Sequence, residues 1–191
     1  IYNNLKIVFR NIIYQLADMG IECTVISPVS ITKYNNKIHE IPTERYEKTK
    51  GGVEVRVISP RFVSFSSKKI GKIDTHVWTV KSYRRAAINQ VIKYNLKFDA
   101  TYGHFINIGG IPACKIAQKY NVPAFVANGE SDLNPETYNY RSKYNLSAFK
   151  QCSGVISVST KNASELKALN LVSPNIINII PNAVDHDVFF P

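Results

Sequence analysis

Several polar residues stand directly after short apolar runs, where a parallel sheet would present its ligand-binding edge. The most polar group follows Val122–Ala127 and consists of Asn128, Gly129, Glu130, Ser131 and Asp132. Glu130 could contact a ligand hydroxyl or transfer a proton, whereas Ser131 or Asp132 could cap a following helix. Both interpretations stay open, and both make this group a candidate site.

His104 is a second candidate, because it follows the apolar run Phe98–Tyr102. An imidazole at a strand end could act as a general base or bind a hydroxyl group, although a lone histidine is often an ordinary polar loop residue. No second His or Cys lies at metal-ligand spacing, so the sequence predicts no metal site.

Ser159, Asn182 and the pair Gly109-Gly110 stand at the other strand and helix boundaries. Ser159 is a natural N-cap for a helix that begins at Thr160, and Asn182 follows an apolar run that Pro181 ends. The glycine pair could offer backbone N–H groups to a phosphate, but a tight strand-to-helix turn is the favoured explanation. Neither GxGxxG nor a Walker A loop is present.

Alternating helices and strands would position these residues. Apolar spacing predicts helices over residues 5–19, 74–96, 111–120, 144–152 and 160–169. Short apolar runs predict strands over 21–27, 53–59, 98–102, 122–127, 154–159 and 175–180, with a loop or irregular hairpin over 30–52. Strands that are apolar throughout, alternating with helices, predict an α/β fold with a Rossmann-like, doubly wound, mostly parallel sheet.

The composition fits an ordinary globular domain of 191 residues, 45% hydrophobic and 20% charged. The formal net charge of +10 favours anionic partners such as nucleic acid, anionic lipid or a phosphorylated ligand, or reflects solvated lysines alone. Cys23, Cys114 and Cys152 have no metal-site spacing and are expected to be buried free thiols. Because no apolar run approaches the ~20 residues that cross a bilayer, we expect a cytoplasmic protein.

The last segment carries the most distinctive pattern. Residues 180–185 read Ile-Pro-Asn-Ala-Val-Asp, and Phe189 and Pro191 follow. This segment resembles the string "I-P-N-G-V-D, three residues, F, any residue, P" that closes the amino-terminal domain of family-four retaining GT-B glycosyltransferases, with Ala183 in place of Gly. Weaker similarities cover most of the chain except 30–80, at Leu16–Ser27, Phe98–Phe105, Lys119–Pro123 and Gly154–Ser159.

The resemblance implies that residues 1–191 are the amino-terminal, acceptor-side lobe of a two-domain GT-B enzyme. Such enzymes move a sugar from a nucleotide-sugar to an acceptor hydroxyl, here a glycan or lipid-linked acceptor, often in cell-surface polysaccharide synthesis. The donor is a co-substrate, no cofactor or metal is expected, and nucleic acid is not an expected partner. Most donor-binding groups of the family belong to a carboxyl-terminal domain, so this lobe should be inactive alone.

The positions at strand ends make Glu130 and His104 the candidate catalytic residues. The candidate substrate contacts at the same kind of position are Asn128, Gly129, Ser131, Asp132, Ser159 and Asn182. The chain departs from the family in two ways. The family's first strand and glycine-rich loop are not found here, so we expect a strand ahead of Ile1. Many members also carry a histidine where this sequence has Asn128, so that histidine's role does not carry over.

Two further hypotheses concern partners. A basic stretch beside Trp78 and Tyr83 could face anionic lipid headgroups at the inner face of the membrane; it comprises Lys68, Lys69, Lys72, Arg84 and Arg85. The alternative function is a non-catalytic nucleotide- or sugar-binding Rossmann-like module. A nucleic-acid-binding function is disfavoured, because the aromatic residues are scattered and no DNA- or RNA-binding motif is found.

Overall fold

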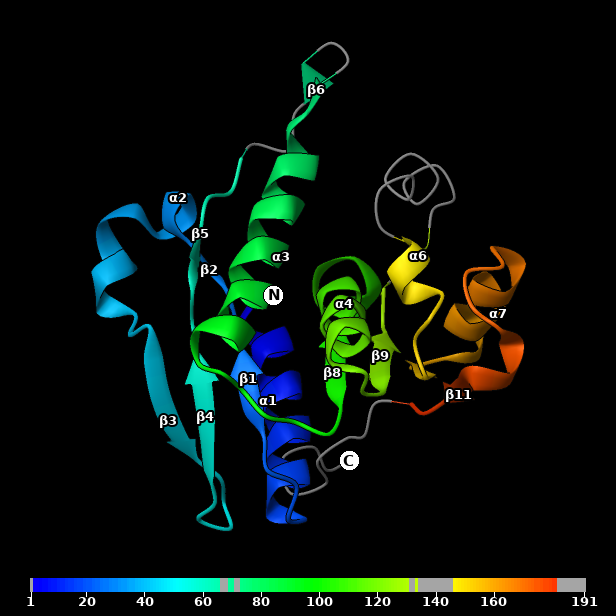
Figure 1. Ribbon diagram of the computed structural model, residues 1–191, viewed down its shortest axis with the longest axis horizontal. Helices are drawn as coiled ribbons and strands as arrows, with labels where there is room; N and C mark the ends of the chain where they lie inside the picture. The colour runs from blue at the N-terminus through cyan, green and yellow to red at the C-terminus, as the bar shows by residue number, and fades with distance from the viewer. Residues whose placement is uncertain (1, 66–68, 71–72, 131–132, 134–145, 182–191) are drawn as a thin grey trace, which may run out of the picture. The chain divides into compact units, whose positions relative to one another are not determined.

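Among the described residues, a three-stranded sheet in the first half of the chain and a four-stranded sheet in the second half organise the fold, with two further two-stranded sheets in the first half (Figure 1). The computed structural model describes residues 2–65, 69–70, 73–130, 133 and 146–181. The chain divides into two compact units, Ile1–Asn95 and Leu96–Pro191. Ser131, Asp132 and Asn182, together with Lys68 and Lys72, lie outside the described residues.

The first unit combines three helices with a small mixed sheet. Its helical elements are α1 (Tyr2–Asp18), α2 (Ile31–Tyr34), the 3-10 helix η1 (Asn35–Glu40) and α3 (Thr75–Lys93). Its strands are β1 (Thr24–Ile26), β2 (Val29–Ser30), β3 (Glu44–Lys48), β4 (Glu54–Ile58), β5 (Arg61–Phe62), β6 (Lys69–Ile70) and β7 (Ile73–Asp74). The main sheet has the order β1-β4-β3, with β1 parallel and β3 antiparallel to β4.

Helix α1 packs its apolar face on this sheet. Ala17 is buried against Val55 and Val57 of β4, as the helical spacing predicts. The helix ends at Asp18, and Gly20 follows with a φ of +90°, which is accessible to glycine at little cost. The expected irregular hairpin over 30–52 is confirmed in part, because β3 pairs with β4 but α2 and η1 precede it.

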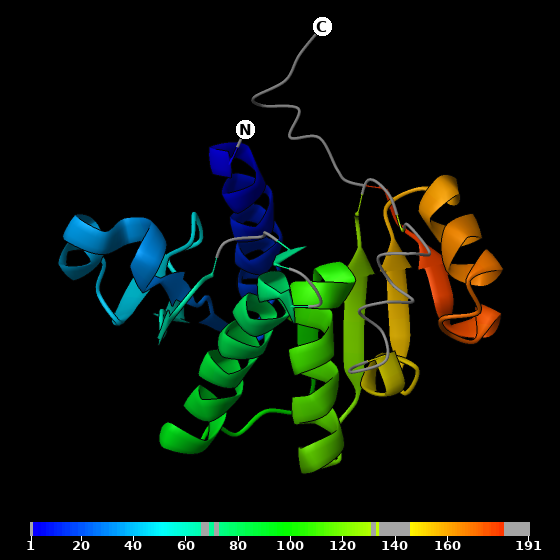
Figure 2. The same cartoon turned by 90° about the horizontal axis from the view of Figure 1, so that it is seen from above.

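The second unit is a parallel sheet with helices alongside. Its strands are β8 (Thr101–His104), β9 (Ala124–Asn128), β10 (Gly154–Ser157) and β11 (Ile177–Ile179). Its helical elements are the π-helix η2 (Phe105–Gly110), α4 (Ile111–Tyr120), α6 (Leu146–Phe149), α7 (Thr160–Ala168) and the 3-10 helix η3 (Pro174–Ile176). The order β11-β10-β9-β8, with every pairing parallel, confirms the Rossmann-like, mostly parallel α/β fold (Figure 2).

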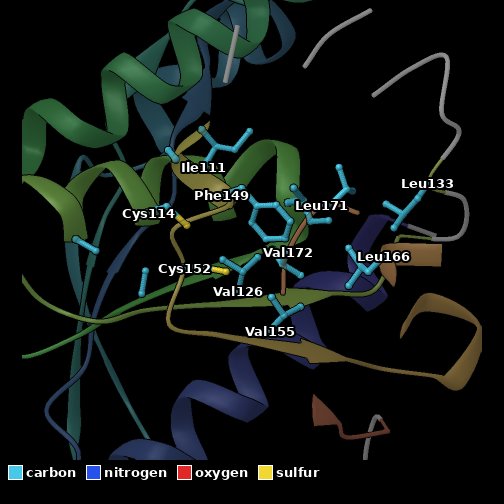
Figure 3. Packing of buried hydrophobic residues seen from close by; sticks show 14 residues of the cluster. Ile111, Cys114, Val126, Leu133, Phe149, Cys152, Val155, Leu166, Leu171 and Val172 are labelled. Atoms are coloured by element: carbon cyan, nitrogen blue, oxygen red, sulfur yellow. The ribbon is translucent and has the colours of Figure 1, made fainter. Parts of the chain in front are cut away.

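The core of this unit lies on one face of the sheet (Figure 3). Val126 and Val155, neighbours in the β9–β10 register, are fully buried there. Phe149 of α6 and Leu166 of α7, also fully buried, pack into the same cluster. Burying such large side chains contributes roughly 1.5–3 kcal/mol each, which makes this cluster a rigid base for the strand ends.

Glycines let the helical segment after β8 approach the sheet closely. A Cβ built on Gly103 would lie 2.5 Å from the carbonyl oxygen of Gly109, and one on Gly110 would lie 2.6 Å from Val126 Cγ1. Gly109 and Gly110 both belong to η2, which continues directly into α4. The pair is therefore helical, not the predicted tight strand-to-helix turn, and its lack of side chains lets η2 lie close to β8 and β9.

The expectation of a strand ahead of Ile1 stays a prediction. In their sheets, β1 and β8 are end strands, so each has one edge that pairs with no strand among the described residues.

The three cysteines are free thiols, but only Cys114 and Cys152 are buried, whereas Cys23 is half-buried. The expected strand over 98–102 begins later, at Thr101.

We predict that Gly103→Ala destabilises the protein by about 1–3 kcal/mol, the usual cost of overpacking. The added methyl group would meet backbone atoms of Gly109 and Gly110, which cannot rotate away as a side chain can. Gly129→Ala is the matched control, because its Cβ would meet its nearest neighbours at an ordinary 3.6 Å. Urea unfolding measures both. Equal free energies of unfolding for the two variants would contradict this account of the packing.

Candidate functional site

The carboxyl ends of β8, β9 and β10 bring most of the predicted site residues to one edge of the sheet. Asn128 and Ser157 are register partners at the ends of β9 and β10, so their side chains point to the same face. His104 pairs with Ala127, one residue earlier, and therefore points to the opposite face. The structure thus brings Asn128 together with Ser157, not with the ring of His104.

Asn128 and Ser157 form a buried polar pair with unused hydrogen-bonding capacity. Both residues are 0% exposed, and the N–H of Glu130 donates to Asn128 Oδ1 over 3.4 Å. Asn128 Nδ2 and Ser157 Oγ have no hydrogen-bond partner in the part of the chain that the structure describes. Each unsatisfied buried group costs about 1–3 kcal/mol, so these two are unusual enough to need an explanation.

Glu130 ties the end of β9 to the helical segment after β8. Its Oε1 accepts the backbone N–H of Ile106 over 2.5 Å. Ile106 lies in the first turn of the helical run that η2 and α4 form, where backbone N–H groups lack intrahelical partners. A carboxylate there also interacts favourably with the helix dipole. This carboxylate thus occupies the position that an anionic ligand would take at that helix terminus.

Ser159 caps α7, as the sequence predicts. Its Oγ accepts the N–H of Asn162 over 3.1 Å and donates to Asn162 Oδ1 over 2.6 Å. Asn162 Nδ2 then donates to the carbonyl oxygen of Glu130 over 2.6 Å. Ser159 therefore acts through Asn162 to hold the loop after β9. Sequence analysis missed Asn162, although its position three residues after an N-cap serine was a usable signal.

His104 lies in an aromatic and partly buried environment. Tyr102 Oη and His104 Nδ1 share a hydrogen bond of 3.0 Å, and the Phe105 ring meets the imidazole edge-on at a centroid distance of 4.5 Å. Burial lowers the pKa of His104 to about 4. The imidazole is therefore neutral at pH 7 and a weak base, better suited to hydrogen bonding than to taking a proton.

Gly129 and Glu130 form the half-buried part of this edge. Gly129 lies next to the ring of Phe105 and the side chain of Val158. A Cβ built on Gly129 would be 3.6 Å from each. Within the described ranges, no group of three or more His, Cys, Asp or Glu residues could hold a metal ion. The edge therefore offers amide, hydroxyl and carboxylate groups, which are hydrogen-bonding groups for a polar ligand.

A comparison with known families decides how this edge is to be interpreted. The model of Glycosyltransferase Family 4 matches residues 6–188, nearly the whole chain. The chain belongs to glycosyltransferase family 4. No curated protein matches it. Family membership makes the protein a glycosyltransferase-type module, with a sugar donor and an acceptor as its substrates.

The glycosyltransferase has no helix long and apolar enough to cross a membrane among its described residues. Its exposed aromatic side chains include Trp78 (47% exposed) and Phe65 (44%), which meet edge to face at a centroid distance of 5.6 Å. Arg85, from the predicted basic stretch, is exposed, but Arg84 is buried, and burial lowers its pKa to about 10. Arg84 therefore does not contribute to a basic surface.

Proposed function

We propose that this chain is the acceptor-binding lobe of a glycosyltransferase that moves a sugar from a nucleotide-sugar to a glycan or lipid-linked acceptor. The observation that supports this function best is the Asn128–Ser157 pair. It lies at the carboxyl ends of parallel strands, where α/β folds bind ligands, in a chain of glycosyltransferase family 4. Cell-surface polysaccharide synthesis is the setting we propose for it.

The pair offers the hydrogen bonds that an acceptor hydroxyl needs. Asn128 Nδ2 can donate, and Ser157 Oγ can donate and accept. Because both groups are fully buried, an acceptor reaches them only if the groups that cover them shift on binding. The hydrogen bonds then formed would offset the free-energy cost of the two unsatisfied groups. Binding of a hydroxyl-bearing acceptor is therefore favoured over leaving the pair buried without a partner.

Glu130 keeps its proposed catalytic role, with one geometric requirement, whereas His104 keeps only the proposed role of binding a hydroxyl group. Glu130 can assist proton transfer only with the carboxylate oxygen that does not bind Ile106 N–H. His104 can bind a sugar hydroxyl through its ring without taking the proton. Charge on the leaving nucleotide would be stabilised by a carboxyl-terminal domain, and no cofactor or metal ion enters this proposal.

One observation favours a non-catalytic sugar- or nucleotide-binding module as a second candidate. Asn128 stands where many family members have a histidine, and an amide cannot act as a base. The low pKa of His104 makes its imidazole a weak base as well. Binding of a sugar without turnover would follow from that arrangement.

Hydrolysis of nucleotide-sugars tests the transferase directly. We expect the protein, produced from its whole coding sequence, to release nucleoside diphosphate from one member of a donor panel. Asn128→Ala and Ser157→Ala should lower kcat/KM with acceptor by about tenfold or more, the effect of losing one good hydrogen bond in a water-excluded site. Lys119→Met, an exposed change on α4, is the matched control and should act within twofold of wild type.

No turnover of any donor, with or without acceptor, would leave the non-catalytic module as the function. Turnover that both Asn128→Ala and Ser157→Ala retain in full would keep the transferase but remove this pair from its acceptor site. Circular dichroism of each variant separates a lost contact from a lost fold.

We also propose that the protein is cytoplasmic and works at the inner face of the membrane, where lipid-linked acceptors reside. Trp78 and Phe65 supply exposed aromatic surface, and the exposed cation Arg85 lies on the same helix as Trp78, a combination that favours membrane interfaces. Trp78→Ala should weaken flotation with vesicles containing anionic lipid several-fold at low salt, whereas Tyr120→Ala, an exposed aromatic of α4, should not. Equal flotation of wild type and Trp78→Ala would refute the membrane contact.

A further inference from the structure

The first unit contains a pocket of about 260 Å³, and its lining includes none of the candidate site residues described above. It lies at the carboxyl ends of β1 and β4, because Ser27 follows β1 and Ser59 follows β4, with Ser27 N–H donating to Ile58 O over 2.8 Å. The lining residues are Ser27, Val29, Tyr34, Glu40, Ile41, Pro42, Arg45 and Ser59. The carboxyl ends of parallel strands are the usual ligand-binding edge of α/β folds, and this unit has its own such edge.

Arg45 is held in a fixed position in this pocket. Its Nε and Nη2 both lie 2.7 Å from Glu47 Oε1, and its Nη1 donates to Ser59 Oγ over 3.1 Å. Glu47 is itself fixed by Tyr14 Oη, which donates to Oε2 over 2.7 Å, and by Arg10, whose Nε lies 3.2 Å from the same oxygen. These hydrogen bonds reduce the freedom of the guanidinium, so less conformational entropy is lost when a ligand binds to it.

Ser59 supplies a hydroxyl at the floor of the pocket. The residue is 1% exposed, and its N–H donates to Thr43 O over 2.7 Å. Its Oγ accepts from Arg45, and the structure records no acceptor for the Ser59 O–H among the described residues. That proton is therefore available to a ligand oxygen.

Further lining residues come from α2, η1 and the chain that follows them. Tyr34 ends α2, the exposed carboxylate of Glu40 ends η1, and Ile41 and Pro42 follow. Arg61 Nη2 donates to Ile38 O over 3.0 Å and also to Ile41 O, which fixes this segment to β5. The lining here thus includes an acidic residue and an aromatic residue beside two aliphatic ones.

This combination matches a sugar ring. A sugar has hydroxyl groups that both donate and accept hydrogen bonds, and C–H faces that pack on aromatic and aliphatic side chains. Arg45 donates, Glu40 accepts and the serines do both, while Tyr34, Ile41 and Pro42 give apolar surface. The opposite charges of Arg45 and Glu40 disfavour a phosphate, and 260 Å³ lies just below the ~300–1,000 Å³ typical of drug-sized ligands, which suits a single ring.

We propose that this pocket binds one sugar ring of the acceptor, with Arg45, Glu40 and Ser59 as its hydrogen-bonding partners. The assignment rests on the proposed transferase function, because the acceptor supplies the sugar. It also assigns a role to residues 34–45, which belong to the stretch 30–52 outside the sequence resemblance.

Saturation-transfer NMR and calorimetry with methyl glycosides of the common hexoses and N-acetylhexosamines test the pocket. We expect one glycoside to bind, and Glu40→Gln and Arg45→Met each to weaken it by about tenfold or more. Lys119→Met, an exposed cation of the second unit, should bind as wild type does. Because Arg45→Met also disturbs Glu47, the exposed Glu40→Gln keeps the test valid if that variant fails to fold.

The outcomes separate this pocket from the transferase itself. Glycoside binding that both variants retain, or donor turnover by a protein that binds no glycoside, would overturn the pocket and leave the function standing. Glycoside binding lost in the variants, without turnover of any donor, would support the pocket and overturn the transferase. Inorganic phosphate that displaces the glycoside and loses its affinity in Arg45→Met would overturn the sugar assignment in favour of an anion site.

Discussion

The second unit depends on one carboxylate. Glu130 joins the end of β9 to the helical run after β8 through Ile106 N–H, and its carbonyl joins the same loop to α7 through Asn162. Three connections that start at neighbouring strand ends are therefore fixed to one residue. A charged acceptor at a helix N-terminus is among the stronger hydrogen bonds a protein makes, so this arrangement can hold the loops above the strands in one geometry.

This constraint explains why polar groups at the strand ends differ in what they can do. Hydrogen bonds of Glu130, Ser159 and Asn162 connect these residues to one another and to backbone groups. These bonds fix the shape of the edge. Asn128 and Ser157 lie beneath that edge on the hydrophobic core and retain unused capacity. A folded protein keeps such a cost mainly where function requires it, which is why the acceptor site is proposed there.

The sequence predicts local structure well and long-range contacts poorly. Helix 111–120 and the Ser159 cap follow from apolar spacing and N-cap chemistry, and both match the structure. The contact of Glu130 with Ile106 spans 24 residues and depends on the β8–β9 register, which spacing cannot reveal. The same register turns His104 away from Asn128. The Arg45–Ser59 contact likewise needs the antiparallel pairing of β3 with β4, and β3 lies within residues 30–52, predicted only as a loop or irregular hairpin.

The Glu130 interaction is tested most directly by amide hydrogen exchange at Ile106. We expect Ile106 N–H to be protected in the wild type and to exchange at least tenfold faster in Glu130→Ala. Glu130→Gln should keep partial protection, because its side chain can still accept a hydrogen bond. Protection that is equal in wild type and Glu130→Ala would show that Glu130 does not hold the helix after β8. Glu130 would then not be the residue that connects the strand ends around the proposed site.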